Sequence, residues 1–156
     1  MCEFFISAPS HSNVDLSQLV GGAGDAIMVC GAQGAITLWN QAAERTFGCT
    51  EAAALGESLG MTIPTRRRQR HWEGQHKTME TAVTQYGADV LRVPALHEDG
   101  RTLSSAPTVS MLFSADEKVS GIVAIVRDES ARFAELRGLR KRLVELAPLQ
   151  LAKESS

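Results

Sequence analysis

The sequence predicts an α+β domain in which helices pack on one face of a five-stranded antiparallel sheet, followed by a C-terminal amphipathic helix. Two apolar, strand-like segments come first, a helical region follows, and three further strand-like segments come after it. This order suits one antiparallel sheet, because hairpins can join its strands while the helices collect on one face. Regularly spaced leucines near the C-terminus predict the final helix.

Composition limits the classes of protein to which the chain can belong. With 156 residues, 44% of them hydrophobic, it can form one domain with a complete core. A net charge of −2 disfavours a nucleic-acid partner. No apolar run approaches a membrane span, and the N-terminus lacks the basic region of a secretory signal, so we expect no membrane partner and a cytoplasmic location. The spacing of the three cysteines is not that of metal ligands, which indicates reduced thiols.

Residues 25–48 are the most informative stretch. The apolar run 26–30 predicts a strand buried on both faces, and the glycines in 31–34 predict a turn into a second strand over 35–39. Asn40 is typical of a helix N-cap, since its side-chain oxygen can accept a free backbone N–H. Gly48 can end the short helix that Asn40 begins.

The rest of the helical region is punctuated by caps and by proline. An N-terminal segment, 1–22, contains a predicted short helix over 14–20 that the following glycines end. Thr50 is expected to cap a single helical turn. Pro64 disfavours helical geometry at the residue before it, so the longest helix of the domain is predicted over 65–79.

Three strand-like segments complete the predicted sheet. They cover residues 90–97, 103–113 and 119–126. Residues 98–100 and 114–117 are rich in turn formers and are expected to connect them as hairpins.

The C-terminal part is predicted to be a helix over 130–147, ended by Pro148, with 148–156 as a tail. Its leucines are spaced by three, four and three residues, which is the pattern of a coiled-coil seam. We therefore expect a homodimer through this helix, and the alternative is a helix docked on its own domain. The four leucines are Leu136, Leu139, Leu143 and Leu146.

Several short motifs together resemble the PAS family over residues 20–130, with the domain itself placed at 23–129. The resemblance implies a PAS fold and a sensory signalling function without enzymatic activity. Asp128 would stand where the last strand passes to a signalling helix, and the output protein would be separate or fused. The motifs are Asp25-Ala26-Ile27, Ile36-Thr37-Leu38-Trp39-Asn40, Ala42-Ala43-Glu44, Phe47-Gly48, Asp99-Gly100 and Arg127-Asp128.

Within this family, the long helix is most similar to that of haem-binding sensors of the FixL and Dos type. Those sensors carry Pro-x-x-x-Arg-x-x-His, which Pro64, Arg68 and His71 match. The resemblance implies haem as cofactor, His71 as the iron ligand, and a diatomic gas or redox state as the signal. A neutral imidazole can hold haem in an apolar pocket through one bond from the histidine to the iron.

The residues around His71 suggest how such a pocket could be built. His71, Gln75 and Met79 recur every four residues and therefore share one helical face. Arginines at 66, 67, 68 and 70 are expected either to reach haem propionates or to form a solvated face. Candidates for the opposite wall are Leu91, Val93, Val109, Met111 and Ile122.

Two positions depart from the oxygen-sensor pattern. Leu91 stands where those sensors place an arginine that binds oxygen, and Asp89 stands where the Dos type has a methionine ligand. The alternatives are that His71 is only a partly buried polar residue and that the domain serves dimerisation or protein interaction. Its pocket would then be empty or hold flavin or another organic molecule.

Overall fold

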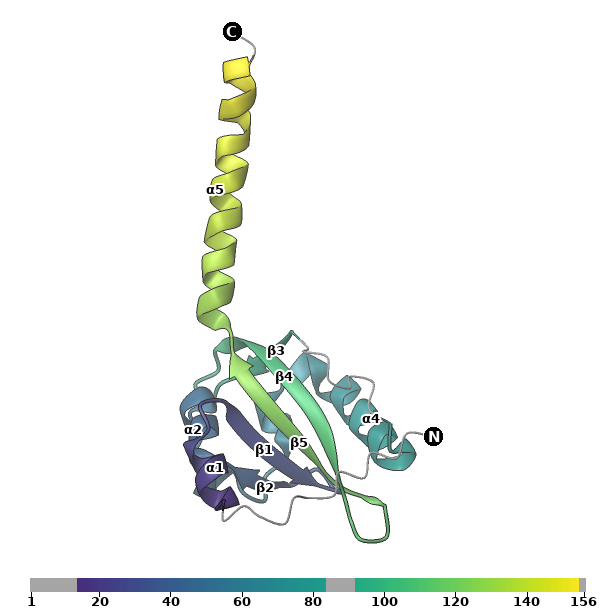
Figure 1. The fold of residues 1–156 in the computed structure, drawn as a ribbon. Coiled ribbons are helices and arrows are strands. Elements are labelled where there is room, and N and C mark those ends of the chain that lie inside the picture. The colour runs from purple at the N-terminus through teal and green to yellow at the C-terminus, as the bar shows by residue number, and fades with distance from the viewer. Residues whose placement is uncertain (1–13, 84–91, 155–156) are drawn as a thin grey trace.

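The protein forms a five-stranded antiparallel sheet with helices over one face (Figure 1). The computed structural model describes residues 14–83 and 92–154. The strand order is β2-β1-β5-β4-β3, and every neighbouring pair is antiparallel, which confirms the predicted fold class. The strands are β1 (Ala26–Gly31), β2 (Ile36–Trp39), β3 (Val93–Leu96), β4 (Thr102–Phe113) and β5 (Val119–Asp128).

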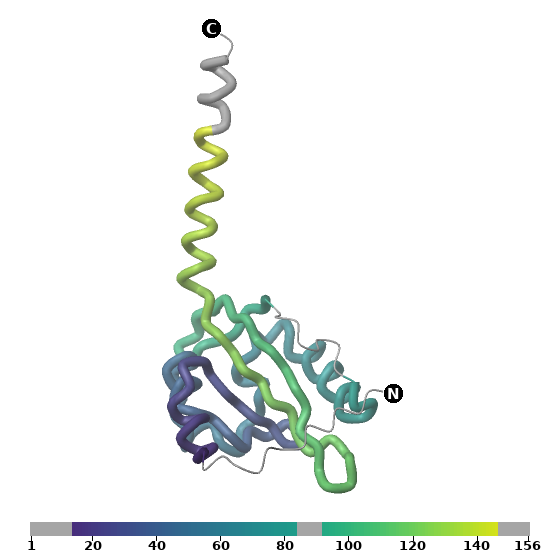
Figure 2. Tube along the Cα trace, viewed as in Figure 1, coloured from purple at the N-terminus to yellow at the C-terminus, as the bar shows by residue number. Residues whose placement is uncertain are grey.

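Helices α2, α3, η1 and α4 lie between β2 and β3 in the sequence, and the last helix projects from the domain (Figure 1). Helix α5 extends away from the sheet as a single rod (Figures 1 and 2). None of the described helices is long and apolar enough to cross a membrane. The helices are α1 (Leu16–Gly22), α2 (Gln41–Phe47), α3 (Glu51–Ala54), the 3-10 helix η1 (Leu59–Thr62), α4 (Thr65–Thr81) and α5 (Ser130–Glu154).

Strand β1 is buried on one face only, which corrects the prediction of burial on both faces. Met28 and Cys30 are buried, whereas Ile27 and Val29 are half-buried. Ile125, the partner of Ile27 on β5, is 41% exposed. The helices therefore cover one face of the sheet and leave an apolar outer face, where strand alternation places every second residue.

Asn40 joins three elements at the start of the domain. Its Oδ1 accepts hydrogen bonds from the backbone N–H of Ala43 and of Ile27, both at 2.9 Å. Its Nδ2 donates to the carbonyls of Val20 (3.0 Å) and Asp25 (3.2 Å). The predicted N-cap is thus confirmed, and the same side chain also ties α1 and β1 to α2. Gly48 ends α2 in the left-handed region, as expected.

Some predicted boundaries differ from the observed ones. Helix α1 begins after Asp15, whose carboxylate caps it, and includes both following glycines. Helix α4 runs two residues beyond the predicted end. Helix α5 continues past Pro148 to Glu154, where a tail was expected. A proline removes one backbone hydrogen bond, and on a projecting helix water can solvate the carbonyl that is left free. Residues 90 and 91 lie outside the described part.

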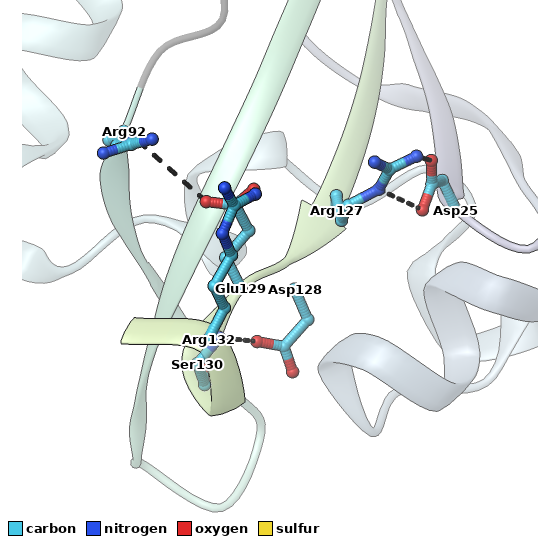
Figure 3. Close-up of polar contacts among 7 residues, drawn as sticks. All are labelled: Asp25, Arg92, Arg127, Asp128, Glu129, Ser130 and Arg132. Carbon is cyan, nitrogen blue, oxygen red and sulfur yellow. Dashed lines mark hydrogen bonds and ion pairs between the residues drawn. The ribbon is translucent and has the colours of Figure 1, made fainter. Parts of the chain in front are cut away.

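Polar contacts fasten the base of α5 to β4, and the Arg127–Asp25 pair joins the end of β5 to the start of the domain. Figure 3 shows that pair and the Asp128–Ser130 contact. The Asp128 carboxylate accepts from the N–H of Ser130, the first residue of α5, at 2.9 Å. Ser104 on β4 uses both backbone groups here, donating to Ser130 Oγ (3.0 Å) and accepting from Glu129 N–H (2.8 Å). Arg127 pairs with Asp25 through two hydrogen bonds of 3.1 and 2.7 Å.

The four leucines of α5 are exposed by 39 to 67%. Because α5 projects from the sheet, the protomer does not bury them. In this conformation α5 does not dock along its own domain (Figure 1), and the dimer stays a prediction.

Candidate ligand-binding site

A cavity of about 680 Å³ lies between α4 and the inner face of the sheet. This is the size range of small-molecule and cofactor sites, which are concave, mostly apolar and few per protein. Its sheet wall follows strand alternation, and the lining residues of β1, β4 and β5 all point to the same face. They are Met28, Cys30, Ser105, Pro107, Val109, Ile122, Ala124 and Val126.

The second wall is α4, where two rows of residues spaced by one helical turn face the cavity. One row consists of Arg67, His71 and Gln75, and the other of Arg66, Arg70, Gly74 and Thr78. The remaining lining residues come from α2, η1, β3 and the residue before Pro64. They are Phe47, Leu59, Thr62, Ile63, Val93, Pro94 and Ala95.

Trp72 positions α4 above the earlier part of the domain. A Cβ atom built on Gly34, whose φ is +81°, would lie 2.7 Å from the Trp72 ring, and one on Gly60 would lie 3.2 Å from it. The indole thus sits against two residues that have no side chain. This close contact holds one side of α4 tightly, while His71 and Gln75 border the open space.

Two buried polar atoms on α4 have no hydrogen-bond partner among the described residues. They are His71 Nδ1 and Gln75 Oε1. Gln75 is only 8% exposed, and its Nε2 lies 3.7 Å from Cys30 Sγ, as a donor to that sulfur. Buried polar atoms normally find partners, so an unpartnered one beside a cavity points to a ligand.

Burial also determines the protonation of the groups in the cavity. It lowers the pKa of His71, so the imidazole is neutral at pH 7 and keeps a lone pair for a metal or a hydrogen bond. It raises the pKa of the Cys30 thiol, which is therefore protonated and a weak nucleophile. No group of three or more His, Cys, Asp or Glu residues in the described part could hold a metal ion.

The hydroxyl groups that line the cavity are already used internally. Thr62 Oγ1 donates to Leu59 O, Thr78 Oγ1 to Gly74 O, and Ser105 Oγ to Val93 O at 2.7 Å. A ligand in contact with the sheet wall therefore meets a mainly apolar surface.

Not all predicted pocket residues line the cavity. His71, Gln75, Val93, Val109 and Ile122 do. Met79 instead packs against the core, and Met111 is half-buried outside the lining. Leu91 and Asp89 lie outside the described residues.

Sequence reasoning missed the contribution of β1 to the cavity. Met28 and Cys30 alternate along this strand, and this period of two was the available signal. His97 was also not anticipated as a packing residue. Its side chain is only 13% exposed, and a Cβ on Gly48 would lie 2.5 Å from the ring.

Comparison with known proteins bears directly on this fold. Residues 15–128 match the family model described as the PAS fold. An uncharacterized protein of Azorhizobium caulinodans is 30% identical over 118 residues, which are 75% of this chain but only 16% of that protein. The chain thus spans about a sixth of the length of this relative.

Solved structures show the same architecture at low sequence identity. A PAS domain of a protein from Colwellia psychrerythraea has a TM-score of 0.65 at 22% identity and covers 74% of this chain and 95% of its own. The PAS domain of Bordetella pertussis BvgS has a TM-score of 0.60 at 20% identity. The match covers 84% of this chain and 96% of the BvgS domain. An RNA-binding light-oxygen-voltage receptor has a TM-score of 0.62 at 16% identity, covering 97% of this chain and 43% of its own.

Proposed function

This chain belongs to the PAS family, and we propose that it is a sensory domain that binds haem in the α4 cavity with His71 as the iron ligand. The observation that carries the proposal is the half-buried, neutral imidazole beside an apolar cavity of about 680 Å³, with its buried Nδ1 unpartnered among the described residues. A neutral histidine is a good axial ligand for haem iron.

The residues present suit the different parts of a haem. His71 would hold the iron, the apolar sheet wall would contact the ring, and arginines on the first turns of α4 would meet the propionates. When bound, haem would supply an iron centre for a diatomic gas or a redox change. Because the hydroxyls of the lining residues donate to backbone carbonyls, we expect weak polar stabilisation of bound O2 and a preference for CO, NO or redox signals.

The test is an absorbance titration of the purified protein with hemin from 300 to 700 nm. We expect a stoichiometric Soret band that His71→Ala abolishes while the unfolding temperature changes little. His76→Ala is the matched control, since His76 is an exposed histidine on the same helix. A spectrum that is unchanged by His71→Ala, or no binding of hemin at all, would contradict this proposal.

A second candidate ligand is flavin or another organic molecule, favoured by Gln75. Its unpartnered Oε1 is a hydrogen-bond acceptor that haem iron does not use, whereas a ring N–H can. One solved structure with a similar fold is a light-oxygen-voltage domain studied with a flavin analogue. Flavin would be recognised by yellow colour and fluorescence after expression, and Gln75→Leu should then weaken its binding.

The proposed output is dimerisation through α5 and contact with a separate or fused signalling partner. The exposed leucines of α5 and the polar contacts at its base support this role, because a change in the sheet can bias the helix that leaves it. Light scattering should give the mass of a dimer, and Leu139→Glu should reduce it to that of a monomer. Leu55→Glu, at an exposed leucine that follows α3, is the control, and a monomeric parent protein would contradict the dimer.

A further inference from the structure

We propose that the cavity selects an organic anion, with its carboxylate or phosphate at Arg66, Arg67 and Arg70 and its apolar body against the sheet. This inference rests on the proposed ligand-binding function, but it does not depend on iron. Haem, with two propionates, is one molecule of this class. Other flat or elongated apolar acids belong to it equally.

The three arginines form a concentrated positive charge at one end of the cavity. All three line it, and they lie within the first two turns of α4. No ion pair within the described residues involves them. Exposed arginines without acidic partners at a cavity mouth are available to an external anion, which they can bind through charge-assisted, bidentate hydrogen bonds.

The helix itself adds to this positive field. The N-terminal end of a helix carries a partial positive charge, which acidic side chains normally offset. Helix α4 has no side-chain cap and no acidic residue in its first turn. Arginines at this end repel one another and the helix dipole, so a bound anion would relieve an unfavourable arrangement.

Gln75 provides independent evidence for a ligand deeper in the same cavity. It is 8% exposed, lines the cavity and has an unpartnered Oε1. Arg67 and Gln75 lie eight residues apart on one helical row, which corresponds to about 12 Å along the axis. A ligand that contacts both Arg67 and Gln75 is therefore an elongated or flat molecule. It has an anionic group at one end, for Arg67, and a hydrogen-bond donor toward the other, for Gln75 Oε1.

The chain supplies a matched control in Arg68. This arginine belongs to the same cluster but does not line the cavity, and its Nε donates to Ile63 O at 3.1 Å. Its substitution removes one positive charge from the same helix, as a single substitution of Arg66, Arg67 or Arg70 does, without removing a cavity contact. General electrostatic attraction and a specific binding site can thus be separated.

The experiment compares 1-pyrenebutyrate with its neutral counterpart 1-pyrenebutanol in fluorescence titrations. We expect the acid to bind at least about tenfold more tightly than the alcohol, since charge-assisted hydrogen bonds form only with the acid. Replacing Arg66, Arg67 or Arg70 singly by Gln should weaken this preference and replacing all three should abolish it, whereas Arg68→Gln, which also removes one charge, should leave it intact. The corresponding triple Lys variant keeps the charge but cannot form the bidentate hydrogen bonds, so it should retain only part of the preference.

Two outcomes would overturn the inference. One is equal affinity for the acid and the alcohol in the parent protein. The other is a preference that the triple Gln variant retains or that Arg68→Gln removes as well. Circular dichroism and thermal unfolding would verify that the triple Gln variant is folded, and the triple Lys variant provides the second comparison.

Failure of this inference can be distinguished from failure of the haem proposal. If hemin gives no His71-dependent Soret band while pyrenebutyrate binding depends on the three arginines, the haem assignment is wrong and the anion site stands. If hemin binds through His71 but affinity for the pyrene acid does not depend on these arginines, the haem proposal stands and the anion site is wrong. If neither molecule binds, both are wrong.

Discussion

The region around Asn40 and the region around α4 differ in whether their buried polar groups have hydrogen-bond partners. Asn40 makes four hydrogen bonds that join α1, β1 and α2. On α4, His71 Nδ1 and Gln75 Oε1 are buried and have no hydrogen-bond partner in the part of the chain that the structure describes. Each such atom costs about 1–3 kcal/mol of stability. The difference indicates that the first region stabilises the fold, while the second keeps binding capacity for a ligand.

The largest expected effect comes from breaking the first region. Asn40→Ala leaves two N–H groups and two carbonyls without their partner, so we expect the free energy of unfolding to fall by about 3 kcal/mol. Urea unfolding followed by circular dichroism would measure this loss. Gln41→Ala, at the exposed neighbouring residue, is the control. A loss as small as that of the control would remove the contrast between the two regions.

Gly121 on β5 lies close to the backbone of β1, and its substitution should have the next largest effect on the free energy of unfolding. A Cβ atom at this position would lie 2.8 Å from the carbonyl oxygen of Cys30, so backbone must move. We expect Gly121→Ala to lower the free energy of unfolding by about 2 kcal/mol. Gly24→Ala is the comparison, because a Cβ there meets nothing within 4 Å. Similar stability of both variants would contradict the close contact.

His71 should make stability depend on pH in the second region. Burial lowers its pKa below the ordinary value of 6.5, so the unfolded chain binds a proton first as the pH falls. Stability should therefore be unaffected above this value and decrease from pH 6.5 down to the pKa of the folded state. His71→Leu should remove that part of the decrease, as measured by urea unfolding at pH 7.5 and 5.5. An identical pH dependence in both proteins would show that the imidazole is not desolvated.

Gly74 is expected to give the smallest effect, and in the opposite direction. It lies inside α4 at the cavity, where a Cβ would meet nothing within 4 Å. Gly74→Ala should raise the free energy of unfolding by about 0.8 kcal/mol through helix propensity. Gly138→Ala, on projecting α5, should increase helicity there without stabilising the domain. A destabilised Gly74→Ala would mean that this part of α4 is packed as tightly as the Asn40 region.

Features of the fold that depend on neighbouring residues could be predicted from the sequence. Asn40, Thr50 and Gly48 cap or end their helices as expected, because a cap needs only a side-chain oxygen or a glycine beside free backbone groups. The order of strands and helices likewise followed from local patterns. His71 was chosen from its resemblance to a family motif, and Gln75 from the helical period that places it on the same face of α4.

What required the tertiary structure was the relation between elements. Sequence alone did not distinguish Arg68, bound to Ile63, from the arginines that line the cavity, because the orientation of α4 relative to the sheet decides it. The same reason explains Met79, which packs into the core, and the one-sided burial of β1. Local chemistry determined where each helix and strand forms, whereas packing across distances in the sequence determined which side chains border an open space.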